Sequence, residues 1–145
     1  MLTDKHILSK TECGQINPVT LAFVGDAVYT LYVKERLVLS GEGKAGEFQR
    51  ASAKIVSAKG QSEFLDKILP MLTEEESAIF RRGKNAKKAT KSKSATNLEY
   101  SRSTGFEAVL GYLYLTGEDD RIRELLAQGD DSVYQRVELE KVFKP

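Results

Sequence analysis

Residues 17–36, NPVTLAFVGDAVYTLYVKER, decide the fold of this chain. Asn17 is a favourable helix N-cap and Pro18 suits the first helical position, so a helix is predicted to begin here. Five apolar side chains recur at helical spacing and predict one broad apolar stripe: Leu21, Val24, Val28, Leu31 and Tyr32. A single acidic residue, Asp26, lies within this apolar run.

Asp26 directly follows Gly25 in the middle of the run. A carboxylate among apolar side chains has to reach a cation, a hydrogen-bond donor or water, because burying it unpaired is costly. From these residues alone two interpretations stay open. Asp26 is either a surface acid beside a close-packing glycine or a carboxylate with a chemical function.

A second helix with similar features is predicted at residues 98–115, and its apolar face consists of Phe106, Val109, Leu110 and Leu113. Glu107 lies off the centre of that face and shares a side with Gly111; taken alone, it is most simply a surface acid. A glycine inside a helix costs about 1 kcal/mol relative to alanine, so Gly25 and Gly111 predict a close helix crossing. Such a crossing would bring Asp26 and Glu107 together.

Helical spacing returns along the whole chain and alternating strand patterns are absent, which predicts an all-α fold. The first helix is predicted to end near Ser40, and further helices at residues 47–58, 61–69, 73–83, 118–128 and from 130 onward. Thr73 and Glu76 form a predicted capping box, Pro70 interrupts or closes the helix before it, and Gly83 is the predicted stop. Residues 84–96 contain no large apolar side chain and are predicted to form a loop.

Composition limits the class of protein. The 145 residues predict a single domain, 1–145, and 41% apolar with 30% charged residues is typical of a soluble globular protein. No apolar run approaches the roughly 20 residues that span a bilayer, and the N-terminus has no signal-peptide core, so a cytoplasmic protein without a membrane partner is expected. Cys13 is the only cysteine and fits a reducing compartment.

Charge is distributed unevenly. The net charge is only +1, but residues 81–102 carry eight basic residues and one acid, a net charge of +7. A local polyanion site is therefore predicted, and phosphate contacts are expected from eight residues: Arg81, Arg82, Lys84, Asn85, Lys87, Lys88, Lys91 and Lys93. The alternative is an ordinary solvated charged segment.

Two stretches, FVGDAVYTLYV at 23–33 and GFEAVLGYLYL at 105–115, resemble the two catalytic helices of the ribonuclease III family. Their order, their spacing and the chain length are similar to the Mini-ribonuclease III branch, which consists of the nuclease domain alone. The resemblance extends over residues 17–128. It implies the family's helical endonuclease fold, a homodimer with Phe23 at the seam, and a duplex grip that does not depend on a separate double-stranded-RNA-binding domain.

The resemblance assigns Asp26 and Glu107 as the catalytic and metal-binding carboxylates. Two carboxylates without His or Cys favour a hard cation, Mg²⁺ before Zn²⁺. The implied reaction is hydrolysis of double-stranded RNA to 5′-phosphate and 3′-hydroxyl ends, with a stem of precursor 23S ribosomal RNA as the expected substrate. Ala22 and Thr104 stand where the family usually has two further acids, which implies one firmly held metal per subunit.

Two other functions are compatible with an all-α chain of this kind. One is a non-cleaving RNA-binding or ribosome-assembly protein of the same fold, although the presence of both Asp26 and Glu107 argues against it. The other is a metal-dependent nucleotide pyrophosphatase. Such enzymes usually pair acids within one helix, and the acids at residues 74–76 are better explained by the capping box. A magnesium-dependent assay on duplex RNA and on free nucleotides would separate the three.

Overall fold

The computed structural model describes residues 2, 7–41, 43–86 and 97–129. Within these ranges the chain is helical with no strand, which confirms the all-α prediction. The elements are α1 (Lys10–Gly14), α2 (Pro18–Ser40), α3 (Ala45–Val56), α4 (Ala58–Ile68), the short 3₁₀ helix η1 (Leu69–Met71), α5 (Glu74–Asn85), α6 (Asn97–Leu115) and α7 (Asp119–Ala127).

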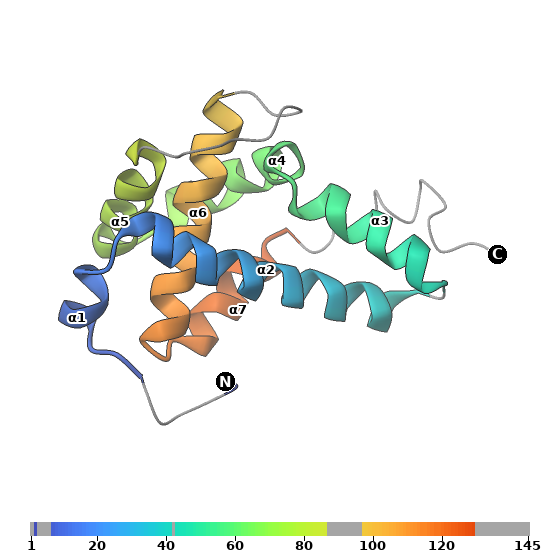
Figure 1. Ribbon diagram of the computed structural model, residues 1–145, viewed down its shortest axis with the longest axis horizontal. Coiled ribbons are helices and arrows are strands. Elements are labelled where there is room, and N and C mark those ends of the chain that lie inside the picture. Colours follow the sequence, from blue (N-terminus) through green and yellow to red (C-terminus); the bar gives the residue numbers. More distant parts are fainter. Residues whose placement is uncertain (1, 3–6, 42, 87–96, 130–145) are drawn as a thin grey trace.

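Two long helices, α2 and α6, cross at the centre of the molecule (Figure 1). Their contact is the most extensive between any two elements, followed by the contact between α5 and α6. Helices α1, α4, α5 and α7 contact α6, whereas α3 packs on α2 and α4, so α6 is the central element of the core. Three aromatic rings hold α2, α4 and α6 together: the ring centroid of Tyr29 lies 5.3 Å from that of Phe106, which lies 5.5 Å from that of Phe64.

The start of α2 is formed by the residues that predict it. The Asn17 side chain accepts a hydrogen bond from the Val19 amide at 2.8 Å, and Pro18 occupies the first turn. The helix ends at Ser40, as predicted. Asn17 satisfies one of the amide groups that a helix start leaves without an intrahelical partner.

The predicted apolar stripe of α2 is wrong in phase. The residues of α2 that are buried are Leu21, Ala22, Gly25, Tyr29, Val33 and Leu37. Leu31 is 54% exposed, and Val24, Val28 and Tyr32 are only partly buried. The prediction followed the large side chains, whereas α6 packs against the side of α2 that carries Ala22 and Gly25, where the backbones can approach.

Several predicted boundaries are also corrected. Helix α3 begins before residue 47, and α4 begins at Ala58 because Ser57 caps it by accepting a hydrogen bond from the Gly60 amide at 3.0 Å. The capping box of Thr73 and Glu76 is confirmed. Gly83 does not stop α5, which continues to Asn85. A Cβ at Gly83 would lie 2.9 Å from the Gly105 Cα, so this glycine serves the packing of α5 on α6.

The sequence pattern did not predict α1. Ser9 and Glu12 form a capping box at its start, and Cys13 is fully buried, with its thiol 3.9 Å from the Tyr112 carbonyl oxygen. Cys13 is therefore a core residue. The helix predicted from residue 130 onward lies outside the described residues. Among those that are described, no helix combines the length and apolar character that crossing a membrane requires.

Candidate active site

Two glycines place the backbones of α2 and α6 in direct contact. A Cβ at Gly25 would lie 1.6 Å from the carbonyl oxygen of Glu107, and one at Gly111 would lie 1.9 Å from the carbonyl oxygen of Leu21. Real Cβ atoms do not come so close to backbone atoms, so this approach requires glycine at both positions. The predicted close crossing is confirmed.

The crossing brings Asp26 and Glu107 together. Asp26 is exposed and Glu107 is partly buried, and the two carboxyl groups lie close enough for Asp26 to act on the titration of Glu107. Burial and the neighbouring Asp26 carboxyl group together raise the pKa of Glu107 to about 9, against a weaker opposing effect of Gln61. In the absence of a cation Glu107 therefore holds a proton at neutral pH. A cation between the two groups could replace that proton.

Gln61 is a third member of the site, and it was missed by the sequence reasoning. Its Nε2 donates to the Val56 carbonyl oxygen at 2.8 Å and lies 3.4 Å from Oε2 of Glu107. The side chain is buried, with 1% exposure, on the inner face of α4. The only available signal was a polar residue in phase with the apolar residues of this helix.

The two positions where further acids were expected offer no ligand. Ala22 is buried one turn before Asp26, and the hydroxyl of buried Thr104 donates to the Tyr100 carbonyl oxygen at 3.0 Å. Among the described residues no group of three or more His, Cys, Asp or Glu side chains could hold a metal ion. Asp26 and Glu107 are therefore the two charged ligands that this site could offer to a cation.

The predicted RNA-binding residues are only partly described. Arg81 and Asn85 are exposed and Lys84 is partly exposed, in the last two turns of α5. Arg82 has a structural contact, because its guanidinium donates to the carbonyl oxygens of Gly14 at 2.8 Å and Ile16 at 3.3 Å. It thereby fixes the connection between α1 and α2. The other four predicted residues lie outside the described ranges: Lys87, Lys88, Lys91 and Lys93.

Comparison with known proteins shows the family of this chain. The Ribonuclease III domain matches residues 19–118, a range that contains Asp26 and Glu107. The chain belongs to the ribonuclease III family. It is 43% identical over 116 residues to Mini-ribonuclease 3 of Symbiobacterium thermophilum, a match that covers 80% of this chain and 89% of that protein. Mini-ribonuclease 3 of a Thermoanaerobacter species is 40% identical over 125 residues, with 86% and 88% covered.

A crystal structure of a protein from Fusobacterium nucleatum has a similar fold. Its TM-score is 0.70 at 31% sequence identity, and the match covers 78% of this chain and 92% of that one. Ribonuclease III enzymes are metal-dependent and act on double-stranded RNA, and this chain is an endoribonuclease of that type. Both relatives are named Mini-ribonuclease 3, which agrees with the predicted branch of the family.

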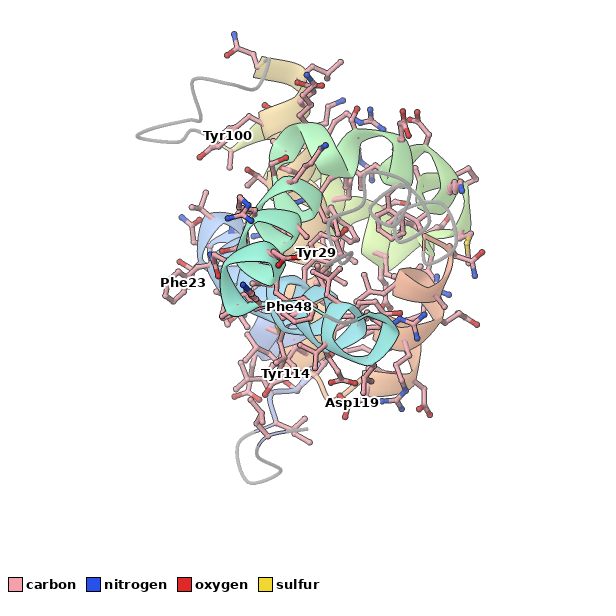
Figure 2. All side chains as sticks on the ribbon, turned by 90° about the vertical axis from the view of Figure 1, so that its right-hand side faces the viewer. Phe23, Tyr29, Phe48, Tyr100, Tyr114 and Asp119 are labelled. Atoms are coloured by element: carbon pink, nitrogen blue, oxygen red, sulfur yellow. The ribbon has the colours of Figure 1, made fainter. Side chains whose placement is uncertain are left out.

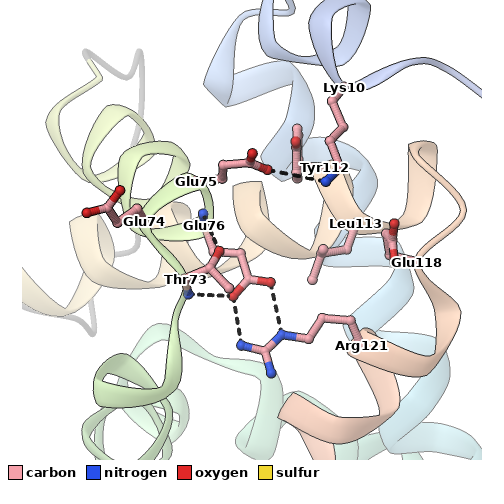
Figure 3. A pocket seen from close by; sticks show the side chains of 9 residues that line it. All are labelled: Lys10, Thr73, Glu74, Glu75, Glu76, Tyr112, Leu113, Glu118 and Arg121. Atoms are coloured by element: carbon pink, nitrogen blue, oxygen red, sulfur yellow. Dashed lines mark hydrogen bonds and ion pairs between the residues drawn. The ribbon is translucent and has the colours of Figure 1, made fainter.

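A pocket of about 600 Å³ lies apart from the candidate active site (Figure 3). Asp26, Gln61 and Glu107 are not among the residues that line it. Its lining residues are Lys10, Thr73, Glu74, Glu75, Glu76, Tyr112, Leu113, Glu118 and Arg121. The Arg121 guanidinium donates to both carboxylate oxygens of Glu76, at 2.8 and 2.9 Å. Burial alone would raise the pKa of Glu76, but hydrogen bonds from Arg121 and Thr73 hold it below its usual value. This ion pair links α7 to α5.

Proposed function

We propose that this protein is a Mg²⁺-dependent endoribonuclease that cleaves double-stranded RNA and leaves 5′-phosphate and 3′-hydroxyl ends. Asp26 and Glu107 are its catalytic, metal-binding carboxylates. The observation that carries the proposal is their apposition across the Gly25–Gly111 crossing. Two helices from distant parts of the sequence meet without side chains between them at the place where the two acids lie.

Mg²⁺ fits the donor set better than the common alternatives. Both groups are carboxylates, and no His or Cys accompanies them among the described residues, which disfavours Zn²⁺ and Cu²⁺. Mg²⁺ is commonly bound by one or two carboxylates together with water and substrate phosphates. A bound Mg²⁺ supplies Lewis-acid chemistry at the phosphodiester. The protein contributes the paired carboxylates, and Glu107 has to release its proton before it can act as a ligand.

The end of α5 and the segment after it provide the grip on RNA in this proposal. Arg81, Lys84 and Asn85 present side chains near the point where the lysine-rich stretch begins. A-form duplexes are recognised mainly through shape, phosphates and 2′-hydroxyls, which lysines and arginines without a base-specific pattern can contact. We therefore assign phosphate contacts to these residues and to the four lysines at positions 87, 88, 91 and 93.

A two-fold homodimer completes the proposed enzyme. Helix α2 exposes an apolar row at four- and eight-residue spacing, with Val19 at 38%, Phe23 at 78% and Leu31 at 54% exposure. Figure 2 shows Phe23 projecting from α2 away from the core. A monomer gains nothing from exposing such a row, whereas a two-fold interface would bury it. The two antiparallel strands of a duplex are related by a local two-fold axis, so each subunit would cut one strand.

The expected substrate is a duplex stem of precursor 23S ribosomal RNA in the cytoplasm, handled by a single nuclease domain. The test is cleavage of a labelled 23S-derived duplex, a single-stranded control and nucleoside triphosphates, each with Mg²⁺ and with EDTA. We expect Mg²⁺-dependent cleavage of the duplex only, with ends that a 5′-phosphate-dependent exonuclease accepts. Hydrolysis of nucleotides in place of RNA would overturn the proposal. Duplex binding without cleavage would indicate the non-cleaving alternative.

A further inference from the structure

We propose that Gln61 is a positioning residue, which holds the Glu107 carboxyl group in place for the cation. This inference rests on the proposed function, because it assumes that Asp26 and Glu107 share a metal ion. Gln61 comes from α4 and Glu107 from α6, so the contact joins two helices at the edge of the α2–α6 crossing. Ligating carboxylates are commonly held by such hydrogen-bonding partners.

The Gln61 side chain is fixed from several sides. Its Nε2 carries two hydrogens, and the two acceptors are the Val56 carbonyl oxygen at 2.8 Å and the Glu107 carboxyl group at 3.4 Å. The second distance is long for a hydrogen bond, and hydrogen bonds in catalytic sites commonly tighten when the ligand binds. With 1% exposure, Gln61 has little freedom to turn away.

The anchor of Gln61 is a rigid junction between α3 and α4. Ser57 accepts from the Gly60 amide at 3.0 Å and donates to the Lys54 carbonyl oxygen at 2.9 Å. A Cβ at Gly60 would lie 2.2 Å from that same carbonyl oxygen, so the end of α3 presses directly on the start of α4. The Val56 carbonyl oxygen is thereby held in place, and the position of the Gln61 amide follows from it.

The carbonyl oxygen of the Gln61 side-chain amide also supports the proposal. Oε1 of Gln61 is buried and has no hydrogen-bond partner among the described residues. A buried acceptor without a donor destabilises the fold. Such a cost is commonly tolerated at functional sites, where an incoming group supplies the missing partner. The hydration water of a cation held by Asp26 and Glu107 is a donor of the required kind.

The test measures binding of Mn²⁺ alone, through the electron paramagnetic resonance of free Mn²⁺, and separately the Mg²⁺ dependence of duplex cleavage. Gln61→Met keeps the length and the apolar stem but removes the amide. We expect its Kd for Mn²⁺ and its half-saturating Mg²⁺ concentration to rise about 10-fold or more, with unchanged duplex binding in Ca²⁺. Glu76→Gln is the matched control: it weakens a buried ion pair that shares no residue with the site, so it lowers stability without changing either value.

The outcomes separate the inference from the proposed function. Unchanged Mn²⁺ affinity in Gln61→Met, together with loss of binding in Asp26→Asn, would overturn the role of Gln61 and leave the metal site intact. Unchanged affinity in both variants would overturn the metal site itself. If Gln61→Met does not fold, Gln61→Asn takes its place. Its shorter side chain cannot reach Val56 and Glu107 at once, so the same rise is expected, and an unchanged Kd would again reject the inference.

Discussion

Gly25 lies against the backbone of Glu107, so that even one additional carbon atom on Gly25 would come within 1.6 Å of the Glu107 carbonyl oxygen. The residue that follows Gly25 is Asp26. Gly25 allows α2 to approach α6 closely, and this approach places the neighbouring Asp26 beside Glu107. The architecture of the core and the chemistry of the site depend on the same contact.

The first prediction concerns this contact. Gly25→Ala should destabilise the fold by about 3 kcal/mol or more, because backbone on both helices has to move. Gly46→Ala is the control, since the nearest atom to its Cβ is the flexible end of Arg50 at 3.6 Å, and it should be neutral or slightly stabilising. Urea unfolding of both variants measures the difference. Equal free energies of unfolding for the two variants would mean that α2 and α6 can move apart at Gly25 without loss of stability.

Asp26→Asn tests the role of the exposed acid. Asn is nearly isosteric, so the fold and duplex binding should be retained, while single-turnover cleavage should slow on the order of a thousandfold or more. Raised Mg²⁺ should rescue part of the rate. Asp120→Asn changes an almost fully exposed acid in α7 and should cleave normally. A rate for Asp26→Asn within tenfold of the parent would make Asp26 a structural acid.

The raised pKa of Glu107 predicts a pH dependence of the metal-free protein. In the unfolded chain this carboxyl group titrates near 4.5, and in the folded chain near 9. Between these values Glu107 holds more protons in the folded state than in the unfolded state, so its contribution to stability falls as pH rises from about 4.5 to 9. Denaturation in EDTA across this range measures the slope, and Glu107→Gln should flatten it. If the slope of stability against pH is unchanged in Glu107→Gln, groups other than Glu107 cause it.

Binding of a metal ion should release the proton that Glu107 holds at neutral pH. Because Glu107 has to deprotonate to act as a ligand, Mg²⁺ affinity should increase as pH rises toward 9 and approach a plateau above it. Calorimetry in buffers of different ionisation enthalpy should detect about one proton released per ion at neutral pH. Affinity that does not vary between pH 6 and pH 9 would contradict this expectation.

The exposed row on α2 predicts the oligomeric state. Phe23→Glu should weaken the dimer by at least about 2 kcal/mol, because an aromatic anchor at an interface centre typically contributes that much. Leu98→Glu is the control, since Leu98 is a large exposed apolar residue on α6, 58% exposed. Sedimentation at micromolar concentration measures both. An active parent protein that sediments only as a monomer would rule out the proposed dimer.

The lysine-rich segment at residues 87–93 should contribute to RNA affinity but not to the cleavage step. Replacing Lys87, Lys88, Lys91 and Lys93 by alanine should weaken duplex binding and reduce its log–log salt slope by up to ~0.9 per lost phosphate contact, the value for B-DNA. Cleavage at saturating RNA should change less than affinity does. Arg82 is unsuitable for this test, because its guanidinium also holds Gly14 and Ile16. Unaltered binding and slope would leave the segment as an ordinary solvated one.

Local sequence signals determined the starts of α2 and α5 and two of the packing glycines, Gly25 and Gly111. Asn17 caps α2, and Thr73 with Glu76 caps α5, through bonds to amides two or three residues away, so the residues that form the cap are visible in one stretch. Gly25 and Gly111 were recognisable because glycine is unfavourable inside a helix unless something approaches closely. These features, with the two motifs, were sufficient to predict an all-α fold and the pairing of Asp26 with Glu107.

Only the tertiary structure decided which surfaces meet. Leu31 is as apolar as Leu21, yet only Leu21 is buried, because the side of α2 that faces α6 is chosen by where two backbones can approach. Gly83 has the signal of a helix stop but is used for packing. Gln61 contacts a residue 46 positions away, and the proton on Glu107 depends on burial and on Asp26. Such properties belong to pairs of distant residues, and no single stretch of sequence contains them.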